Sequence, residues 1–178
     1  MLSFLIEYFV IKQEMIEMKY EHEITIFLSR IQVVEYYTNL DTLKKWFINP
    51  SLPTRFTEQS LELLEGKPWQ PGAKTKFLET QNTRYGPRTR VLIHTVMQND
   101  LPDEFVFSIE SGGVKTTSYN YYQEEARDVT RWISRNEVEF SGAAKKLSFL
   151  MKRGIRSQSH LIMKRFKKQA ERAYAHEK

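Results

Sequence analysis

The sequence predicts a single α+β domain in which a curved antiparallel sheet of seven strands wraps around a long C-terminal helix, with two short helices after strand one. Short turn signals separate strands two to seven, which makes them antiparallel because a parallel crossover needs about a dozen residues or more. The chain ends in an amphipathic segment of about 34 residues, which as a helix would extend about 50 Å and cross the whole sheet.

Composition is consistent with one soluble domain. The chain has 178 residues, of which 40% are hydrophobic and 13% aromatic, and no stretch approaches the roughly 20 apolar residues of a membrane span. Cysteine is absent, which excludes disulfides, a thiolate metal site and a cysteine nucleophile. Its absence also fits a reducing compartment, so we expect a cytoplasmic protein.

The first 17 residues begin with an apolar run but do not read as a signal peptide. They lack a basic region and a small-residue cleavage site, and Glu7 interrupts the run. The periodic domain pattern begins at Met18. We therefore expect residues 1–17 to be an extension, either an extra helix or the product of an upstream start codon, and residues 18–175 to form one domain.

Strand one and the two short helices follow from local signals. Apolar residues alternate from Lys19 onward and predict a strand that carries Ile24, Ile26 and Leu28. Ser29 and Gln32 match a capping box and predict a helix over residues 30–38. Asp41 could cap a second helix through residue 45, which would bring Trp46 and Phe47 to a helix-to-loop junction.

Glycine and proline turns divide the middle of the chain into six strands, and one long helix follows them. The predicted strands cover residues 55–64, 74–80, 89–98, 104–110, 114–123 and 128–140. Ser141 is the predicted cap of a helix over residues 142–175. Apolar residues at three- and four-residue spacings predict one stripe facing the sheet, formed by Leu147, Leu150, Met151, Ile155, Leu161, Ile162, Phe166, Ala170 and Ala173.

Several motifs accompany this order of elements: Trp46 after the helix pair, Gly66-Lys67-Pro68 with Pro71-Gly72, Leu101-Pro102-Asp103-Glu104-Phe105, Trp132, and Phe140-Ser141-Gly142. From Met18 to Glu171 the chain resembles the START-like, or polyketide-cyclase-like (SRPBCC), superfamily, and most of all an uncharacterised bacterial branch of it. The resemblance implies a helix-grip fold with a hydrophobic cavity between the sheet and the C-terminal helix. Members include lipid and hormone carriers, aromatase/cyclases and plant allergens, so no single chemistry is implied and no catalytic motif transfers.

Strand alternation suggests which side chains line that cavity. Strand five would turn Phe105, Phe107 and Ile109 inward, and strand seven would turn Trp132, Ser134, Asn136, Val138 and Phe140 inward. Strand six has two phases, one placing Thr116, Ser118, Asn120 and Tyr122 inside, the other Thr117, Tyr119 and Tyr121. We favour the first, because a cluster of buried polar groups would bind water or a polar part of a ligand.

The candidate ligand-binding residues combine this wall with the helix junctions and the final helix. Trp46 and Phe47 are expected to border the entrance. Gly154 interrupts the long helix, either to leave cavity volume or, as we favour, to permit a kink or a close approach to a strand. The full set is His22, Ile24, Trp46, Phe47, Phe77, His94, Phe105, Phe107, Ser118, Asn120, Trp132, Asn136, Leu150 and Gly154.

Catalytic and cofactor signals are sparse. His22 and His94 are the obvious groups for proton transfer near neutral pH, although strand four allows either Leu92, His94 and Val96 or Val91, Ile93 and Thr95 to face inward. No metal-binding spacing and no glycine-rich phosphate loop occurs, so we expect no metal and no cofactor.

Charge is concentrated in the final helix. Residues 142–178 carry a balance of +9, against −4 for the rest of the chain. Lys164, Arg165, Lys167, Lys168 and Arg172 could contact anionic lipid or nucleic acid, but a solvated outer face explains them equally and is the interpretation we favour. No aromatic interleaving supports a nucleic-acid platform.

Three function classes remain. We expect a carrier or sensor that binds a small hydrophobic or amphipathic molecule, as a monomer or homodimer. The alternative is an enzyme of the cyclase, hydratase or hydrolase type that uses the same cavity, and the third class is a partner-binding scaffold.

Overall fold

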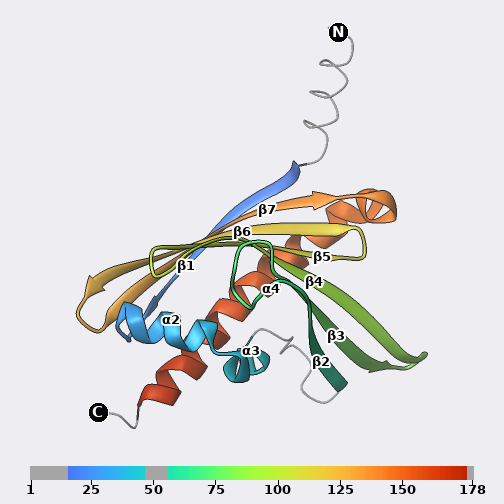
Figure 1. The fold of residues 1–178 in the computed structure, drawn as a ribbon. Coiled ribbons are helices and arrows are strands. Elements are labelled where there is room, and N and C mark those ends of the chain that lie inside the picture. The colour runs from blue at the N-terminus through green and yellow to red at the C-terminus, as the bar shows by residue number, and fades with distance from the viewer. Residues whose placement is uncertain (1–15, 47–55, 176–178) are drawn as a thin grey trace, which may run out of the picture.

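The computed structural model describes residues 16–46 and 56–175, which form one seven-stranded antiparallel sheet crossed by a long helix (Figure 1). The strand order β1-β7-β6-β5-β4-β3-β2 places the first strand beside the last. The predicted fold class is therefore confirmed. The elements are β1 (Ile16–Ile26), α2 (Arg30–Thr38), α3 (Leu40–Trp46), β2 (Phe56–Glu65), β3 (Lys74–Thr83), β4 (Gly86–Asp100), β5 (Glu104–Ser111), β6 (Val114–Ala126), β7 (Val129–Phe140) and α4 (Gly142–Tyr174).

Side-chain capping starts both short helices. The predicted capping box at α2 is present, with the Gln32 amide donating to Ser29 Oγ and the Ser29 amide donating to Gln32 Oε1. The predicted cap of α3 is wrong by two residues. The Asp41 amide donates to Asn39 Oδ1 at 2.8 Å, so Asn39 satisfies the first turn and Asp41 lies inside it.

The start of α4 is tied to the β5–β6 hairpin. Ser141 occupies the predicted cap position, but its side chain makes no capping hydrogen bond. Its hydroxyl and its backbone amide both donate to the carbonyl oxygen of Gly113, at 3.1 and 2.7 Å. The hydroxyl is thus used to join two elements, which corrects the expectation that it caps the helix.

The helix α4 packs chiefly against β1, and only its C-terminal half is deeply buried. There Phe166 meets the Tyr36 ring at 5.5 Å and the Trp46 ring at 5.0 Å, so α2 and α3 pack against this half of the helix. The predicted apolar stripe is wrong in part, because the N-terminal half lacks such a cover. The buried residues of α4 as a whole are Ala144, Met163, Phe166 and Ala170, whereas Leu147, Leu150, Leu161 and Ala173 are exposed.

The register of the sheet settles the two open strand phases. His94 and Val96 of β4 are buried and lie opposite Ile109 and Phe107 of β5, so the Leu92, His94 and Val96 phase faces inward. In β6, Ser118 and Asn120 lie opposite Phe107 and Phe105 and share their face of the sheet, which is the phase we favoured.

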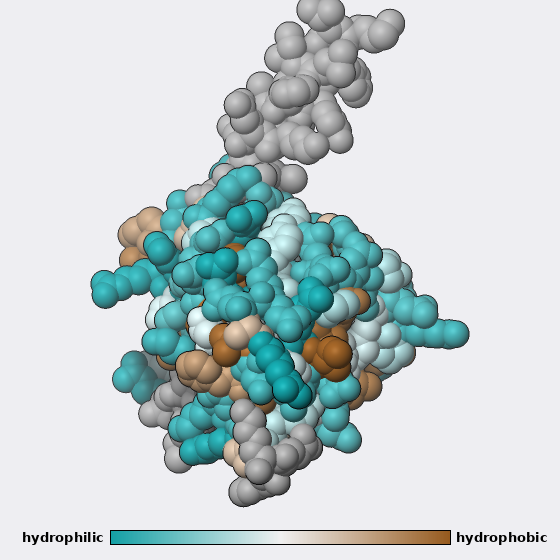
Figure 2. Space-filling view, turned by 90° about the vertical axis from the view of Figure 1, so that its left-hand side faces the viewer, coloured by the Kyte–Doolittle hydropathy of each residue, from teal (hydrophilic) through white to brown (hydrophobic). Residues whose placement is uncertain are grey.

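The surface at the side where α2 and the β6–β7 turn lie is mainly hydrophilic, and its apolar side chains form small separate groups (Figure 2). Within the described part of the chain, no helix combines the length and the apolar character that a membrane span requires.

Candidate functional site

A cavity of about 150 Å³ lies between the sheet and α4. Since one water molecule occupies roughly 15 Å³ of such cavity space, the cavity holds about ten waters or one small organic molecule. Strands β1 and β3–β7 contribute to its wall together with α2, α3 and α4. The lining residues are Tyr20, Tyr37, Trp46, Phe77, Glu79, Arg90, Leu92, Phe107, Ile109, Ser111, Val114, Thr116, Ser118, Asn120, Trp132, Ser134, Asn136, Ile155, Gln158, Ser159, Ile162 and Met163.

Aromatic rings form the deep part of the wall. Trp132 meets the Phe166 ring at 5.1 Å and nearly perpendicular, and it stacks on Tyr122 at 5.7 Å. Trp46 is only 1% exposed and packs on the Tyr37 ring at 5.0 Å. Such contacts fix the ring planes and provide a rigid apolar surface for a ligand.

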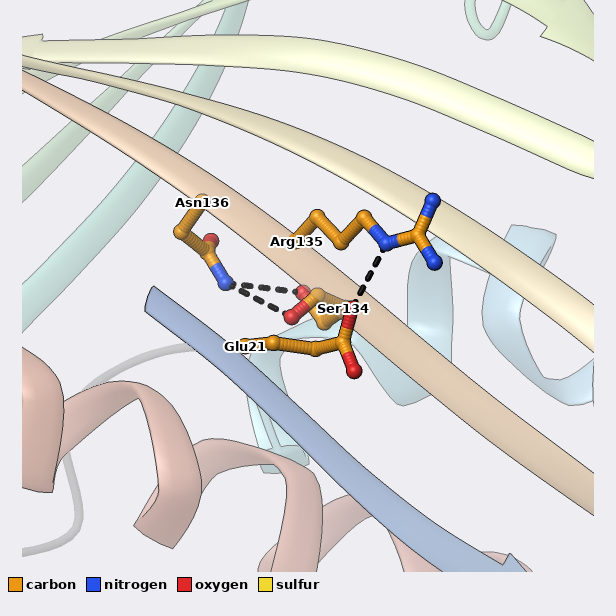
Figure 3. Close-up of polar contacts among 4 residues, drawn as sticks. All are labelled: Glu21, Ser134, Arg135 and Asn136. Carbon is orange, nitrogen blue, oxygen red and sulfur yellow. Dashed lines mark hydrogen bonds and ion pairs between the residues drawn. The ribbon is translucent and has the colours of Figure 1, made fainter. Parts of the chain in front are cut away.

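A set of four buried polar side chains, which we call the polar ladder, runs across the wall on β6 and β7: Ser118, Asn120, Ser134 and Asn136. Ser118 Oγ donates to Asn136 Oδ1 at 2.7 Å, and Asn136 Nδ2 donates to Ser134 Oγ at 3.2 Å. Figure 3 shows Asn136 turned towards Ser134, while the side chain of Arg135 reaches Glu21 on β1.

The remaining member of the polar ladder is anchored separately. Asn120 Oδ1 accepts from Trp132 Nε1 at 2.9 Å, and Asn120 Nδ2 donates to the Phe105 carbonyl oxygen at 3.2 Å. Hydroxyl and amide groups have more donors and acceptors than these contacts use, so the ladder can hydrogen-bond to a ligand as well. Its partners also hold each side chain in one orientation, which lowers the entropy lost on binding.

Two charged residues, Glu79 and Arg90, add to the wall and were missed in the sequence. They lie directly opposite each other on β3 and β4, and Glu79 is 6% exposed. Arg90 is exposed and its Nε donates to Ser111 Oγ at 3.2 Å, so this part of the wall reaches solvent. Alternation from Phe77 would have placed Glu79 inward, because residues two apart share a face.

Half of the fourteen candidate residues line the cavity: Trp46, Phe77, Phe107, Ser118, Asn120, Trp132 and Asn136. Trp46 is buried within the wall and does not form an exposed rim, and Phe47 lies outside the described residues. Leu150 and Gly154 do not line the cavity because both face solvent. A Cβ added at Gly154 would meet nothing within 4 Å, so neither cavity volume nor a close approach to a strand explains this glycine.

The other candidates lie in the body of the protein. His22 contacts α4, with its Nε2 2.9 Å from the Arg156 carbonyl oxygen and its ring 4.9 Å from that of His160. His94 packs on the Phe107 ring at 4.8 Å, and Ile24 and Phe105 belong to the hydrophobic core. Neither histidine lines this cavity, and His94 borders a smaller pocket of about 20 Å³ beside Trp69 and Phe77.

Burial keeps the imidazole of His94 and the phenols of Tyr37 and Tyr122 uncharged at neutral pH. It lowers the pKa of His94 to about 4 and raises the pKa values of Tyr37 and Tyr122 above the ordinary tyrosine range. Among the described residues, no group of three or more histidine or acidic side chains could hold a metal ion. The cavity wall thus offers uncharged aromatic and amide side chains for hydrogen-bonding and apolar contact, and the side chains of Glu79 and Arg90 lie in the same wall.

No protein-family model and no curated protein matches the chain. Solved structures do match. Ara h 8.0201 superposes with a TM-score of 0.61 at 16% identity, covering 86% of this chain and 97% of that one. The Zhui aromatase/cyclase from Streptomyces sp. R1128 gives 0.62 at 10% identity, with 87% and 94% covered. A protein from Arthrobacter aurescens gives 0.64 at 10% identity, with 86% of each chain covered.

At these identities the matches establish the fold alone. The helix-grip fold that the sequence motifs implied is confirmed, because the chain has seven antiparallel strands, two short helices and a long C-terminal helix, and the matched structures superpose on 86% or more of it.

Proposed function

We propose that the protein binds a small amphipathic molecule in the cavity and acts as its carrier or sensor. One observation carries this proposal: the polar ladder lies in a wall that is otherwise largely aromatic and aliphatic. Burying four polar side chains costs free energy unless each is hydrogen-bonded, and their partners leave capacity for one more polar group. A molecule with an apolar body and a hydroxyl, carbonyl or amide group fits that combination.

Native mass spectrometry of the freshly purified full chain is the first test. We expect a small molecule to accompany the folded protein and to be lost on unfolding. If no adduct is found, binding of added probe molecules decides whether the cavity accepts a ligand.

The second test uses two probes of equal heavy-atom count, cyclohexanol and methylcyclohexane. Tryptophan fluorescence reports binding because Trp46 and Trp132 line the cavity. Since one hydrogen bond contributes about 1 to 1.5 kcal/mol, Asn136→Leu should shift the ratio of the two dissociation constants about tenfold towards methylcyclohexane. Ser118→Ala should shift the ratio in the same direction.

Arg135→Gln is the matched control, because its neighbour Asn136 faces the cavity while Arg135 pairs with Glu21 at 2.6 Å outside it. The control should keep the wild-type ratio. No fluorescence response to either probe, or an equal shift in Arg135→Gln, would contradict the proposal.

A second candidate, an enzyme of the cyclase, hydratase or hydrolase type, is favoured by Glu79. A carboxylate that is 6% exposed within a cavity wall is positioned to act as a general base on a bound molecule. If the molecule recovered by mass spectrometry is converted by the wild type and left intact by Glu79→Gln, the enzyme is the better description. Binding without conversion in both proteins favours the carrier or sensor.

The sequence contains no cysteine, which fits a reducing compartment, and we extend the proposal to a cytoplasmic site of action.

A further inference from the structure

Large apolar side chains are exposed in the N-terminal half of α4. Leu147, Phe149 and Leu150 are 52%, 71% and 66% exposed. Single exposed apolar residues are ordinary on protein surfaces, but three within four positions of one helix indicate a contact surface.

Cations lie among these side chains. Lys146 and Arg153 stand three or four positions from Phe149 and Leu150, so the four share one side of the helix, and both cations are exposed. We call Lys146, Leu147, Phe149, Leu150 and Arg153 the apolar–basic patch. From residue 142 to residue 170 the sequence has no acidic residue and nine basic ones: Lys145, Lys146, Lys152, Arg153, Arg156, Lys164, Arg165, Lys167 and Lys168.

We propose that the apolar–basic patch docks the protein on an anionic lipid bilayer. Phe149 and Leu150 enter the interface between headgroups and acyl chains, and Lys146 and Arg153 bind headgroup phosphates. Apolar residues combined with Lys and Arg on one helix are the composition of interfacial membrane helices, and each cation near an anionic surface adds to the attraction.

Other occupants fit the patch less well. An isologous contact with a second copy would bring Lys146 and Arg153 against the same cations, which repel each other. A single-stranded nucleic acid needs successive aromatic rings for stacking, whereas this side offers one aromatic ring and two leucines.

The patch also adjoins the cavity. Met151, which follows Leu150, packs in one cluster with Val114 and Ile155, and those two residues line the cavity. A bilayer bound here would lie close to the part of the wall formed by the β5–β6 hairpin and α4. Docking itself requires no bound ligand, so it can be tested whether or not the cavity is filled.

The test is sedimentation of the full chain with vesicles. We expect binding to vesicles of phosphatidylcholine with 30% phosphatidylserine, little binding to phosphatidylcholine alone, and weaker binding as salt rises. Phe149→Ala with Leu150→Ala should lower the partition coefficient at least about tenfold, and Lys146→Glu with Arg153→Glu should lower it similarly. All four side chains are exposed, so the melting temperature of each variant should stay close to that of the wild type.

Ile31→Ala is the matched control, because Ile31 is 67% exposed on α2, away from the patch, and its removal should leave vesicle binding unchanged. Failure of the wild type to bind anionic vesicles, or an equal loss in Ile31→Ala, overturns the proposal. Unchanged vesicle binding in Phe149→Ala with Leu150→Ala also overturns it. In that case, faster proteolysis within residues 1–15 of this variant than of the wild type would show that this segment binds the patch. Loss of a wild-type dimer in the variant would show that a second copy binds it.

Discussion

His94 shows how a buried side chain makes stability depend on pH. Burial lowers its folded-state pKa to about 4, below the ordinary value of 6.5. Between these values the unfolded chain binds a proton that the folded protein does not. Its contribution to stability is therefore complete above about pH 6.5 and is lost as pH falls towards 4.

We expect this histidine to lower the free energy of unfolding by about 3 kcal/mol between pH 7 and pH 4. His94→Phe keeps an aromatic ring beside Phe107 and removes the titration, so its unfolding free energy should fall less with acid. Urea unfolding at several pH values measures both proteins. Parallel pH profiles would show that His94 has the same pKa in the folded and unfolded chains, which would contradict this prediction.

Replacing either of two glycines by alanine should change the stability of the protein, in opposite directions. A Cβ at Gly113 would lie 2.8 Å from the Ser141 carbonyl oxygen, and its φ of +79° disfavours any side chain. Gly154 lies in a helix with open space around it. We expect Gly113→Ala to cost more than about 1 kcal/mol and Gly154→Ala to stabilise the protein by up to about 1 kcal/mol. Thermal melting tests both, and destabilisation by Gly154→Ala would point to a contact made by the backbone there.

Residue-level prediction from the sequence succeeded where a local rule applies. The capping box needs only Ser29 and Gln32, and alternation from Phe107 and Trp132 places the polar ladder inward. His22 lies on the face of β1 that alternation gives it, but alternation does not show that α4 covers that face at this position, where His22 contacts the Arg156 carbonyl oxygen.

At the scale of elements, α4 has two unequal halves. Met163, Phe166 and Ala170 are almost fully buried, and Lys167 Nζ donates to the Thr25 carbonyl oxygen at 2.7 Å. The Phe27 amide donates to Glu171 Oε1 at 2.9 Å, which adds a second link to the end of β1. The N-terminal half has Ala144 as its buried residue and the Ser141–Gly113 hydrogen bonds at its start.

Phe166→Ala should therefore lower the free energy of unfolding by about 3 to 5 kcal/mol, since it removes a ring that contacts Tyr36, Trp46 and Trp132. Leu150→Ala, on the same helix but exposed, should change it by less than about 0.5 kcal/mol. Chemical denaturation compares the two. Equal losses would mean that the N-terminal half is buried in solution.

The bounds of most elements could be predicted because glycine and proline turns punctuate the strands. The buried face of α4 could not be predicted in full, because its apolar residues cover a wide arc and helical spacing does not show which part meets the sheet. Leu147 and Leu150 were assigned to the sheet for this reason, and Met163 was overlooked.

At the scale of the whole molecule, the structure allows residues 1–15 to be removed without cutting a described element. The strand β1 begins at Ile16, opposite Glu139 of β7, two residues before the predicted domain boundary. We expect a chain that starts at Ile16 to unfold in one cooperative transition with a melting temperature near that of the full chain. Calorimetry of both proteins tests this, and loss of the transition would make the first 15 residues part of the folded unit.

Because the two halves of α4 are held unequally, we expect the barrier to ligand escape to differ from the barrier to global unfolding. For the proposed carrier or sensor, we expect a molecule to leave the cavity when the lightly held start of the helix lifts, whereas global unfolding must also extract Phe166 and its neighbours. Residence time and thermodynamic stability can then vary separately. A weakened Ser141–Gly113 link would shorten the residence time at nearly constant melting temperature, and a weakened C-terminal half would lower the melting temperature while ligand escape stays slow.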